Sequence, residues 1–229
     1  MSTAAISIDQ PVQPAIVDAC PHFGADYASG LERSGLADNA WRRPRFFHLV
    51  QMFRLTAGLD GATAEAGVFR GLASYLLCCE QRRETPGYAG AGHFGIDSFE
   101  GLPTPGHVDA DPSYAGRFAD TSLNTARDTL GEFPRATLIK GWIPDAFDEL
   151  PEQQYRFVHV DVDLHDPTRD SLAYFYPRVV PGGLIVVDDY GPWPNGDFPG
   201  CKAAVDQFAA RQGCAVATLD TGNAVIFKR

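Results

Sequence analysis

The sequence predicts an α/β fold in which a doubly wound, mostly parallel sheet of seven strands is covered by helices on both faces. Two features of the chain predict it. Short apolar runs alternate with helical segments along most of the 229 residues, as in sheets built from right-handed βαβ crossovers. Only residues 220–223 separate the last two apolar runs, and so short a connection joins antiparallel strands. The sheet should therefore finish on an antiparallel hairpin.

The clearest of the expected strands are rich in β-branched or aromatic residues, as at 156–161, 183–188 and 224–228. Each helix between the strands has apolar residues at spacings of three and four. A turn at Pro181-Gly182-Gly183 should bring the chain back before the fifth strand. The expected strands are 63–68, 93–97, 137–140, 156–161, 183–188, 215–219 and 224–228, and the helices between them are 72–83, 122–130, 167–176 and 201–210.

Residues 1–58 are expected to form an N-terminal extension whose helices pack on a main domain at 59–229. Residues 1–37 are rich in Ala, Pro, Asp and Ser and have weak periodicity, which predicts a mobile tip followed by short helical turns. From Pro44 onward, apolar residues fall on one helical face until Gly58. This second segment should be the helix that packs on the domain.

Composition argues against several classes of protein. The formal net charge of −10 is unfavourable for binding phosphate backbones. The chain has no uncharged apolar run long enough to span a bilayer, and its first residues lack the features of a signal peptide. Its five cysteines have no paired spacing, which fits a reducing environment. We expect a cytoplasmic protein that binds neither nucleic acid nor membrane.

A short basic patch, WRRPR at residues 41–45, interrupts this acidic background. The patch is too short to reverse the electrostatic field of the whole chain. It fits the solvated start of a helix, and it could also approach an anionic group on a ligand.

Acidic residues lie at the ends of the first two expected strands. Glu65 precedes Gly67 and Gly71 at the turn into the first long helix, where glycine lets the backbone approach a ligand closely. This is not the G-x-G-x-x-G pattern that places a pyrophosphate at a helix N-terminus, and an acid there favours a cationic ligand group. Asp97 ends the second strand, which is the ribose-binding position of nucleotide-binding sheets; it could instead cap the following turn.

Two more acids, Asp161 and Asp163, follow the fourth expected strand. Strand alternation would point Phe157, His159 and both acids to one face, provided that the strand stays regular. Neighbouring carboxylates repel each other at neutral pH unless a cation or a shared proton compensates. His159 should be a buried residue whose polar atoms are satisfied.

Asp188 and Asp189 end the fifth, fully apolar strand, which should lie beside the fourth. Carboxylates from neighbouring strand ends meet at the crevice where open α/β sheets bind ligands. Either pair of acids alone could be solvated, but both pairs together call for a cation. An all-oxygen cluster favours a hard cation, with magnesium ahead of calcium and manganese.

These motifs resemble the macrocin O-methyltransferase type of sugar methyltransferases, which act in antibiotic tailoring and include relatives from mycinamicin and novobiocin assembly. The terminal hairpin also distinguishes a class I methyltransferase sheet from the dehydrogenase version of the Rossmann fold, whose strands are all parallel. The matching blocks are EAGVFRG (65–71), GIDSFEGLP (95–103), KGWIPDAF (140–147), HVDVDLHDPT (159–168), FYPRVVPGG (175–183), VVDDYG (186–191) and CKAAVDQF (201–208).

The resemblance implies an enzyme that uses S-adenosylmethionine and Mg²⁺ to methylate a sugar hydroxyl of a glycosylated natural product. It also implies a homodimer or higher homo-oligomer, a mobile lid at 104–121, and Asp163 as the general base. Asp161, Asp188 and Asp189 would be the metal ligands, and His165 stands where the family often has tyrosine. The residues implied for the cofactor are Glu65, Ala66, Gly67, Val68, Phe69 and Ser74 for its methionine part, Asp97 and Ser98 for its ribose, and Gly141 and Trp142 for its adenine.

Two other functions are compatible with the same motifs. A catechol-type phenolic O-methyltransferase would use the same cofactor and metal on an aromatic diol. A non-catalytic S-adenosylmethionine-binding protein would keep the fold, although such proteins usually lose the metal-site acids, and all four are present in this chain.

Overall fold

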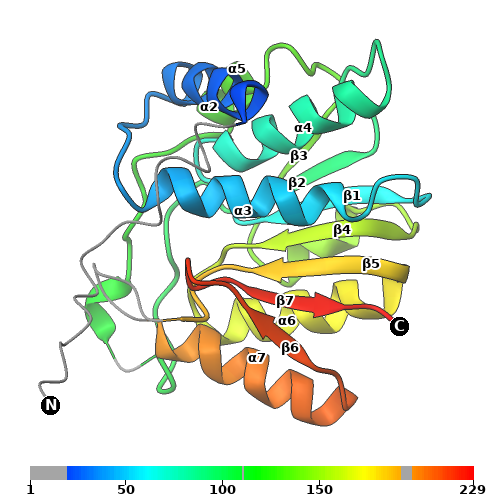
Figure 1. Ribbon diagram of the computed structural model, residues 1–229. Coiled ribbons are helices and arrows are strands. Elements are labelled where there is room, and N and C mark those ends of the chain that lie inside the picture. Colours follow the sequence, from blue (N-terminus) through cyan, green and yellow to red (C-terminus); the bar gives the residue numbers. More distant parts are fainter. Residues whose placement is uncertain (1–19, 110, 192–197) are drawn as a thin grey trace, which may run out of the picture.

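The structure, a computed structural model, describes residues 20–109, 111–191 and 198–229. Within them, seven strands form one sheet in the order β3-β2-β1-β4-β5-β7-β6 (Figure 1). The predicted α/β fold is confirmed. The strands are β1 (Ala62–Ala66), β2 (His93–Asp97), β3 (Thr137–Lys140), β4 (Tyr155–Val160), β5 (Val179–Val187), β6 (Val216–Thr218) and β7 (Ala224–Phe227).

The strand directions also agree with the prediction. Strands β1 to β5 pair in parallel, whereas β7 pairs antiparallel with both β5 and β6. Only β7 therefore runs against the others. Because β1, β4 and β5 are neighbours and parallel, their carboxyl ends lie at the same edge of the sheet, and that edge carries the acids singled out above.

Helices cover the two faces of the sheet in two groups (Figure 1). Helices α2, α3 and α4 share one core with Phe157, Leu184 and Val225 of the sheet, and α5 packs beside them against α2 and α4. Helices α6 and α7 pack together on the other face. The helices are α2 (Pro21–Ser34), α3 (Arg42–Arg54), α4 (Leu72–Glu84), α5 (Leu123–Thr129), α6 (His165–Phe175) and α7 (Pro199–Gln212).

The N-terminal segment is more regular than predicted. The expected mobile tip falls largely on residues 1–19, which lie outside the described residues, but the expected short turns are replaced by the 14-residue helix α2. Its weak apolar pattern includes Gly30, where a β-carbon would lie 2.6 Å from a methyl carbon of Leu72. Glycine lowers helix propensity, but here it allows α2 to approach α4 closely, so tertiary packing overrides the local preference.

The predicted turn at Pro181-Gly182-Gly183 is wrong, because β5 begins earlier, at Val179, and runs through these residues. The pairing of β4 with β5 changes register between Tyr155 and Phe157. A β-carbon on Gly183 would lie 2.8 Å from the carbonyl oxygen of Arg156. Glycine here marks an irregularity inside a strand rather than the end of one.

Helix α3 packs tightly on the sheet, as predicted. Phe53 is fully buried, and its ring meets that of Phe157 on β4 edge-to-face at 5.3 Å between centroids. The helix shares this core with α4. The division of the chain at residue 58 stays a prediction.

Phe53→Ala should destabilise the chain by about 3–5 kcal/mol, because it leaves a cavity between α3 and β4. Thermal unfolding followed by circular dichroism should show a lower Tm with a single transition. Leu55→Ala is the matched control, since Leu55 lies two residues away and is 61% exposed. A variant in which only a minor early transition moves would show that the N-terminal helices unfold separately from the sheet.

Two further expectations from the sequence concern disulfide bonds and membrane-spanning helices. All five cysteines are free, so no disulfide staples this core. No helix in the described part of the chain is both long and apolar enough to cross a membrane.

Candidate active site

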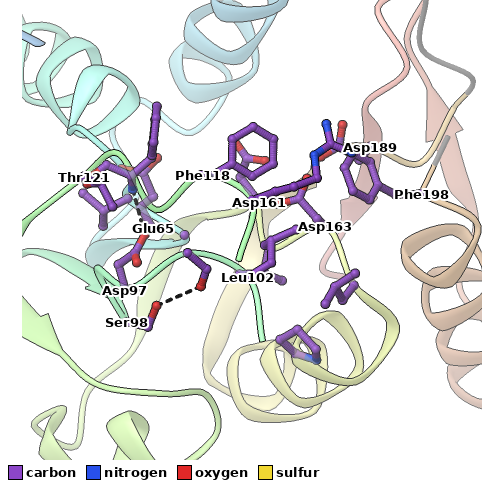
Figure 2. Close-up of a pocket in the computed structure, with 18 of the residues that line it drawn as sticks. Glu65, Asp97, Ser98, Leu102, Phe118, Thr121, Asp161, Asp163, Asp189 and Phe198 are labelled. Carbon is purple, nitrogen blue, oxygen red and sulfur yellow. Dashed lines mark hydrogen bonds between the residues drawn. The ribbon is translucent and has the colours of Figure 1, made fainter. Parts of the chain in front are cut away.

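A cavity of about 610 Å³ opens at the carboxyl edge of the sheet. Figure 2 shows Glu65 and Asp97 toward one end of it, and Asp163 and Asp189 toward the other. Three parts of the chain form its walls: the α2–α3 region, the strand ends with their loops, and the segment from Gly101 to Thr121. The cavity therefore combines residues from the N-terminal extension and from the main domain.

Most of the residues predicted for the cofactor line this cavity. Ala66 and Ser74 do not: Ala66 is fully buried in the core, and Ser74 is buried behind Glu65. The Ser74 hydroxyl donates to Glu65 Oε2 and lies 2.8 Å from His93 Nε2, so it fixes the acid rather than reaching the cavity. Those that do line the cavity are Glu65, Gly67, Val68, Phe69, Asp97, Ser98, Gly141 and Trp142.

Asp97 organises two loops at the cofactor end of the cavity. Its Oδ2 accepts a hydrogen bond of 2.7 Å from the backbone N–H of Phe69, and its Oδ1 accepts one of 2.6 Å from that of Phe99. The expected turn-capping role and a ligand-binding role are therefore compatible, because a carboxylate oxygen has a second lone pair. Burial raises the pKa of Asp97, and these backbone donors oppose the rise.

Gly67 is required by the protein's own backbone. It has a φ of +89°, and a β-carbon would lie 1.8 Å from the carbonyl oxygen of Asp161. The expected close approach thus involves the chain that leaves β4, although Gly67 also faces the cavity. Any larger side chain would push the β1 turn away from the acids.

The four aspartates come together as predicted from their positions at the strand ends. The backbone N–H of Asp161 donates to Ala66 O at 2.8 Å, and that of Asp188 donates to Val160 O at 2.8 Å. These bonds continue the sheet ladder by one residue beyond β4 and β5. Asp161, Asp163 and Asp189 line the cavity, whereas Asp188 lies behind them with 1% of its surface exposed.

Strand alternation does not account for Asp163. Strand β4 ends at Val160, and Asp163 has a left-handed backbone with a φ of +60°, as does Asp189 with +57°. Such conformations are costly for non-glycine residues and tend to occur at functional sites. The non-glycine residues with positive φ in the described chain are Phe69, Phe99, Phe118, Asp163 and Asp189, and all but Phe99 line the cavity.

The carboxylates form two overlapping groups that could hold a metal ion. Asp161, Asp163 and Asp189 offer oxygens within 4.8 Å of one another, and so do Asp161 and Asp188 together with a ring nitrogen of His159. Asp161 belongs to both groups. The geometry therefore brings all four predicted acids together without by itself separating a base from the ligands.

Charge in this cluster is unevenly compensated. Burial and the charge of Asp188 raise the pKa of Asp161 well above its usual range, and burial and Asp163 do the same for Asp189. Burial raises the pKa of Asp163 to about 6. Asp188 differs, because the nearby Arg45 and His159 outweigh the effect of its burial and lower its pKa. For the other three acids, nearby positive charge does not outweigh the effects of burial and of the neighbouring carboxylates.

His159 is buried and satisfied, as predicted, and it joins the two ends of the site. Its Nδ1 lies 3.1 Å from Glu65 Oε1, and its Nε2 lies 3.7 Å from Asp188 Oδ2. Burial opposes its protonation, but these two carboxylates raise its pKa to about 10. A charged His159 therefore lies between the acid at the cofactor end and one acid of the cluster.

Three contributors to the site were not identified from the sequence. Arg45, from the patch expected to be solvated, reaches the acids from α3. Asn223, in the connection before β7, donates to Asp188 Oδ1 at 2.5 Å. Arg117 lies 5.2 Å from the ring centre of Phe118 and 5.6 Å from that of Phe198. The run of arginines at the start of α3 was the one local sequence feature that pointed to any of these three residues.

His165, which stands where the family often has tyrosine, is not among the cavity-lining residues. It begins α6 and is 8% exposed. Its backbone N–H donates to Asp109 Oδ1 at 2.7 Å, and its ring lies 2.8 Å from Asp166 Oδ1. In this arrangement it anchors the segment around Asp109 to the start of the helix.

Known proteins resemble this chain in sequence. A tetracenomycin-derivative 4'-O-methyltransferase from Streptomyces olivaceus is 28% identical over 170 residues, covering 69% of this chain and 62% of that protein. Mycinamicin III 3''-O-methyltransferase from Micromonospora griseorubida is 27% identical over 176 residues, covering 69% and 64%. The match thus spans less than two thirds of the length of these relatives.

Solved structures share the fold along nearly the whole chain. The O-methyltransferase NovP superposes with a TM-score of 0.72 at 22% identity, covering 93% of this chain and 98% of that one. The calicheamicin methyltransferase CalS11 gives a TM-score of 0.68 at 17% identity, covering 99% and 98%. The profile of the macrocin-O-methyltransferase (TylF) family matches residues 26–229. The chain therefore belongs to the macrocin-O-methyltransferase family.

Proposed function

We propose that this protein is an S-adenosylmethionine- and Mg²⁺-dependent O-methyltransferase that methylates a sugar hydroxyl of a glycosylated natural product. One observation carries the proposal. A single cavity has Glu65 and Asp97 at one end and Asp161, Asp163 and Asp189 at the other. Such a cavity can hold a cationic methyl donor beside a hydroxyl acceptor that needs deprotonation. Family membership supports the choice of donor.

At the donor end, each residue would face a ligand group that suits its chemistry. Glu65 would accept hydrogen bonds from the amino group of the donor's methionine part, and Asp97 would accept them from its ribose hydroxyls. Trp142 is 42% exposed although it lines the cavity, so its indole is available to cover the adenine. Ser98 and Gly141 complete this wall.

The acid cluster fits a divalent cation on the basis of its own chemistry. Asp161, Asp163 and Asp189 offer carboxylate oxygens within 4.8 Å of one another, and like charges that lie so close need a cation. The cavity-facing donors are carboxylate oxygens, which suit Mg²⁺. Asp161, Asp188 and Asp189 would hold the ion. When bound, Mg²⁺ supplies Lewis-acid stabilisation of the acceptor oxygen and a template for adjacent hydroxyls.

Asp163 would take the proton from the acceptor hydroxyl. The acceptor oxygen then forms its bond to the methyl carbon as the bond from that carbon to the donor sulfur breaks, leaving a neutral thioether and a protonated Asp163. Its raised pKa, about 6, brings this carboxylate closer to the range that suits a general base at neutral pH. Its left-handed backbone lies at the cavity wall.

A panel of acceptors tests the substrate class. Methyl transfer from S-adenosylmethionine should be detected by mass shift on glycosides with adjacent free hydroxyls, and catechols should be poor acceptors. One relative described above is named as a methyltransferase of a rhamnosyl tetracenomycin, which is a glycosylated compound. Turnover of catechols alone would favour the phenolic alternative, and donor binding without turnover of any diol would favour a non-catalytic role.

Asp97→Ala should weaken S-adenosylmethionine binding by about 10- to 100-fold, because it removes a charged hydrogen-bond acceptor at the ribose position. Isothermal titration calorimetry measures the Kd. Glu100→Gln is the matched control: Glu100 lies on the same loop, but its side chain is 54% exposed and pairs with Lys140. Unchanged donor affinity in folded Asp97→Ala would remove Asp97 from the donor site.

A further inference from the structure

The acid cluster receives a cation from the N-terminal helix α3. Arg45 Nη1 lies 3.1 Å from Asp188 Oδ2, and its Nη2 lies 3.8 Å from Asp161 Oδ2. The guanidinium thus spans two of the three aspartates proposed above as metal ligands. Its side chain is 23% exposed and lines the cavity.

Arg45 faces the oxygen of Asp188 that is left for a metal ion. Asp188 Oδ1 accepts a hydrogen bond from Asn223, whereas Oδ2 accepts none. The groups near Oδ2 are Arg45 and, at 3.7 Å, His159 Nε2. Mg²⁺ binds carboxylate oxygens at about 2.0–2.1 Å and requires near-octahedral geometry. An ion that ligates Asp161 and Asp188 through these oxygens would need the place that the guanidinium occupies.

We propose that Arg45 is the built-in counter-ion of the metal-free site, and that a divalent cation must displace its guanidinium from Asp161 and Asp188 in order to bind. The inference rests on the metal site of the proposed function. Two cations confined to the same pair of carboxylates repel each other strongly in a poorly solvated site. Arg45 compensates the two acids before the metal ion arrives, when the charge of His159 alone would not balance both of them.

The two cations beside Asp188 differ in their freedom to leave. His159 is 1% exposed and is held on its other side by Glu65. Arg45 lines the cavity with 23% of its side chain exposed, so the cavity itself is the space into which its guanidinium would withdraw. Its helix also supplies Arg42 and Phe46 to the cavity wall. His159 stays as the permanent counter-charge, and Arg45 is the exchangeable one.

The test is a calorimetric titration of Mg²⁺ into the full-length protein and its variants, without donor or acceptor. Arg45→Gln should tighten Mg²⁺ binding by about tenfold, because the ion no longer displaces or faces a positive charge. Arg45→Lys, which keeps the charge but loses the two-pronged contact, should fall between the wild type and Arg45→Gln. Arg42→Gln is the matched control, since Arg42 lines the same cavity one turn earlier; its Kd should stay within about twofold of the wild type.

Thermal unfolding provides a second measurement. Arg45→Gln should lower the Tm of the metal-free protein, and saturating Mg²⁺ should raise its Tm by more than it raises that of the wild type, because a ligand stabilises in proportion to its affinity. A crystal structure with Mn²⁺ bound should show the Arg45 guanidinium withdrawn from Asp188.

The outcomes separate this inference from the proposed function. Equal or weaker Mg²⁺ binding by folded Arg45→Gln, or a metal-bound structure with Arg45 still on Asp188 Oδ2, overturns the displacement and leaves the metal-dependent methyltransferase standing. If neither the wild type nor Arg45→Gln binds Mg²⁺ or Mn²⁺, both the displacement and the metal site are wrong. Methyl transfer that persists under chelation would then show Arg45 to be the resident cation of the site.

Discussion

Asp163→Asn should lower kcat by about 10²- to 10⁴-fold, the usual contribution of general-base assistance. Asparagine keeps the size and the left-handed backbone preference of aspartate, but it cannot take up a proton. S-adenosylmethionine should bind to the variant with a Kd within about twofold of the wild type, because the general base contributes to the reaction step rather than to donor binding. Single-turnover kinetics combined with a donor-binding titration separate the two quantities.

Asp166→Asn is the control for this substitution. Asp166 lines the same cavity, but its side chain is 62% exposed and pairs with His165 and Arg169. Its variant should keep the wild-type kcat. If Asp163→Asn retained full turnover, the base would have to be another group, and Asp189 would be the first candidate because it shares the same group of carboxylates.

The pH dependence of the reaction offers another measurement on Asp163. A general base works only when deprotonated, so kcat/KM should rise with pH through the pKa of this group and level off above it. Burial raises that pKa to about 6, and a bound divalent cation would lower it again. The acidic limb of the profile should therefore lie at or below about pH 6, and a limb near pH 8 would point to a different base.

Removal of the metal ion should reduce the rate of methyl transfer more than any single substitution. Exhaustive treatment with EDTA should reduce methyl transfer to background, and added Mg²⁺ should restore it. The physical reason is that Asp163 alone provides about 10²- to 10⁴-fold, so stabilisation of the acceptor oxygen must come from elsewhere. Methyl transfer measured with and without chelator tests this prediction. Full activity after chelation would contradict the proposed metal role.

Asp188→Ala should produce a related loss that the Mg²⁺ concentration sufficient for the wild type does not repair. The variant removes the buried oxygen that lacks a hydrogen bond and leaves Arg45 and His159 without their shared partner. We expect Mg²⁺ binding to weaken by about 10- to 100-fold. Asp220→Ala is a suitable control, because Asp220 follows β6 with 61% of its side chain exposed.

Local sequence patterns predicted most of the fold. Strands β2 and β3 have the predicted bounds, because short apolar runs between turn residues have few alternatives. The errors fall where local and tertiary preferences conflict. Gly30 disfavours a helix locally but allows α2 to pack on α4, and Gly182 with Gly183 signals a turn but lies within β5.

The sequence by itself determined that acids lie at the ends of β1, β2, β4 and β5. Parallel strands of one sheet bring their carboxyl ends to one edge, so these acids had to meet there once the strands were identified. What it could not determine was which groups neutralise them. Arg45 and Asn223 reach Asp188 from positions 143 and 35 residues away in the chain.

Only the tertiary structure decided which groups neutralise the acids, for a physical reason. Contacts between distant segments depend on how whole elements pack, and packing of α3 on the sheet places Arg45 at the cluster while leaving no periodic signal in the chain. The left-handed backbone of Asp163 is likewise fixed by its surroundings, since the residue alone disfavours it. The acids follow from the order of residues along the strands, and their counter-charges follow from the packing.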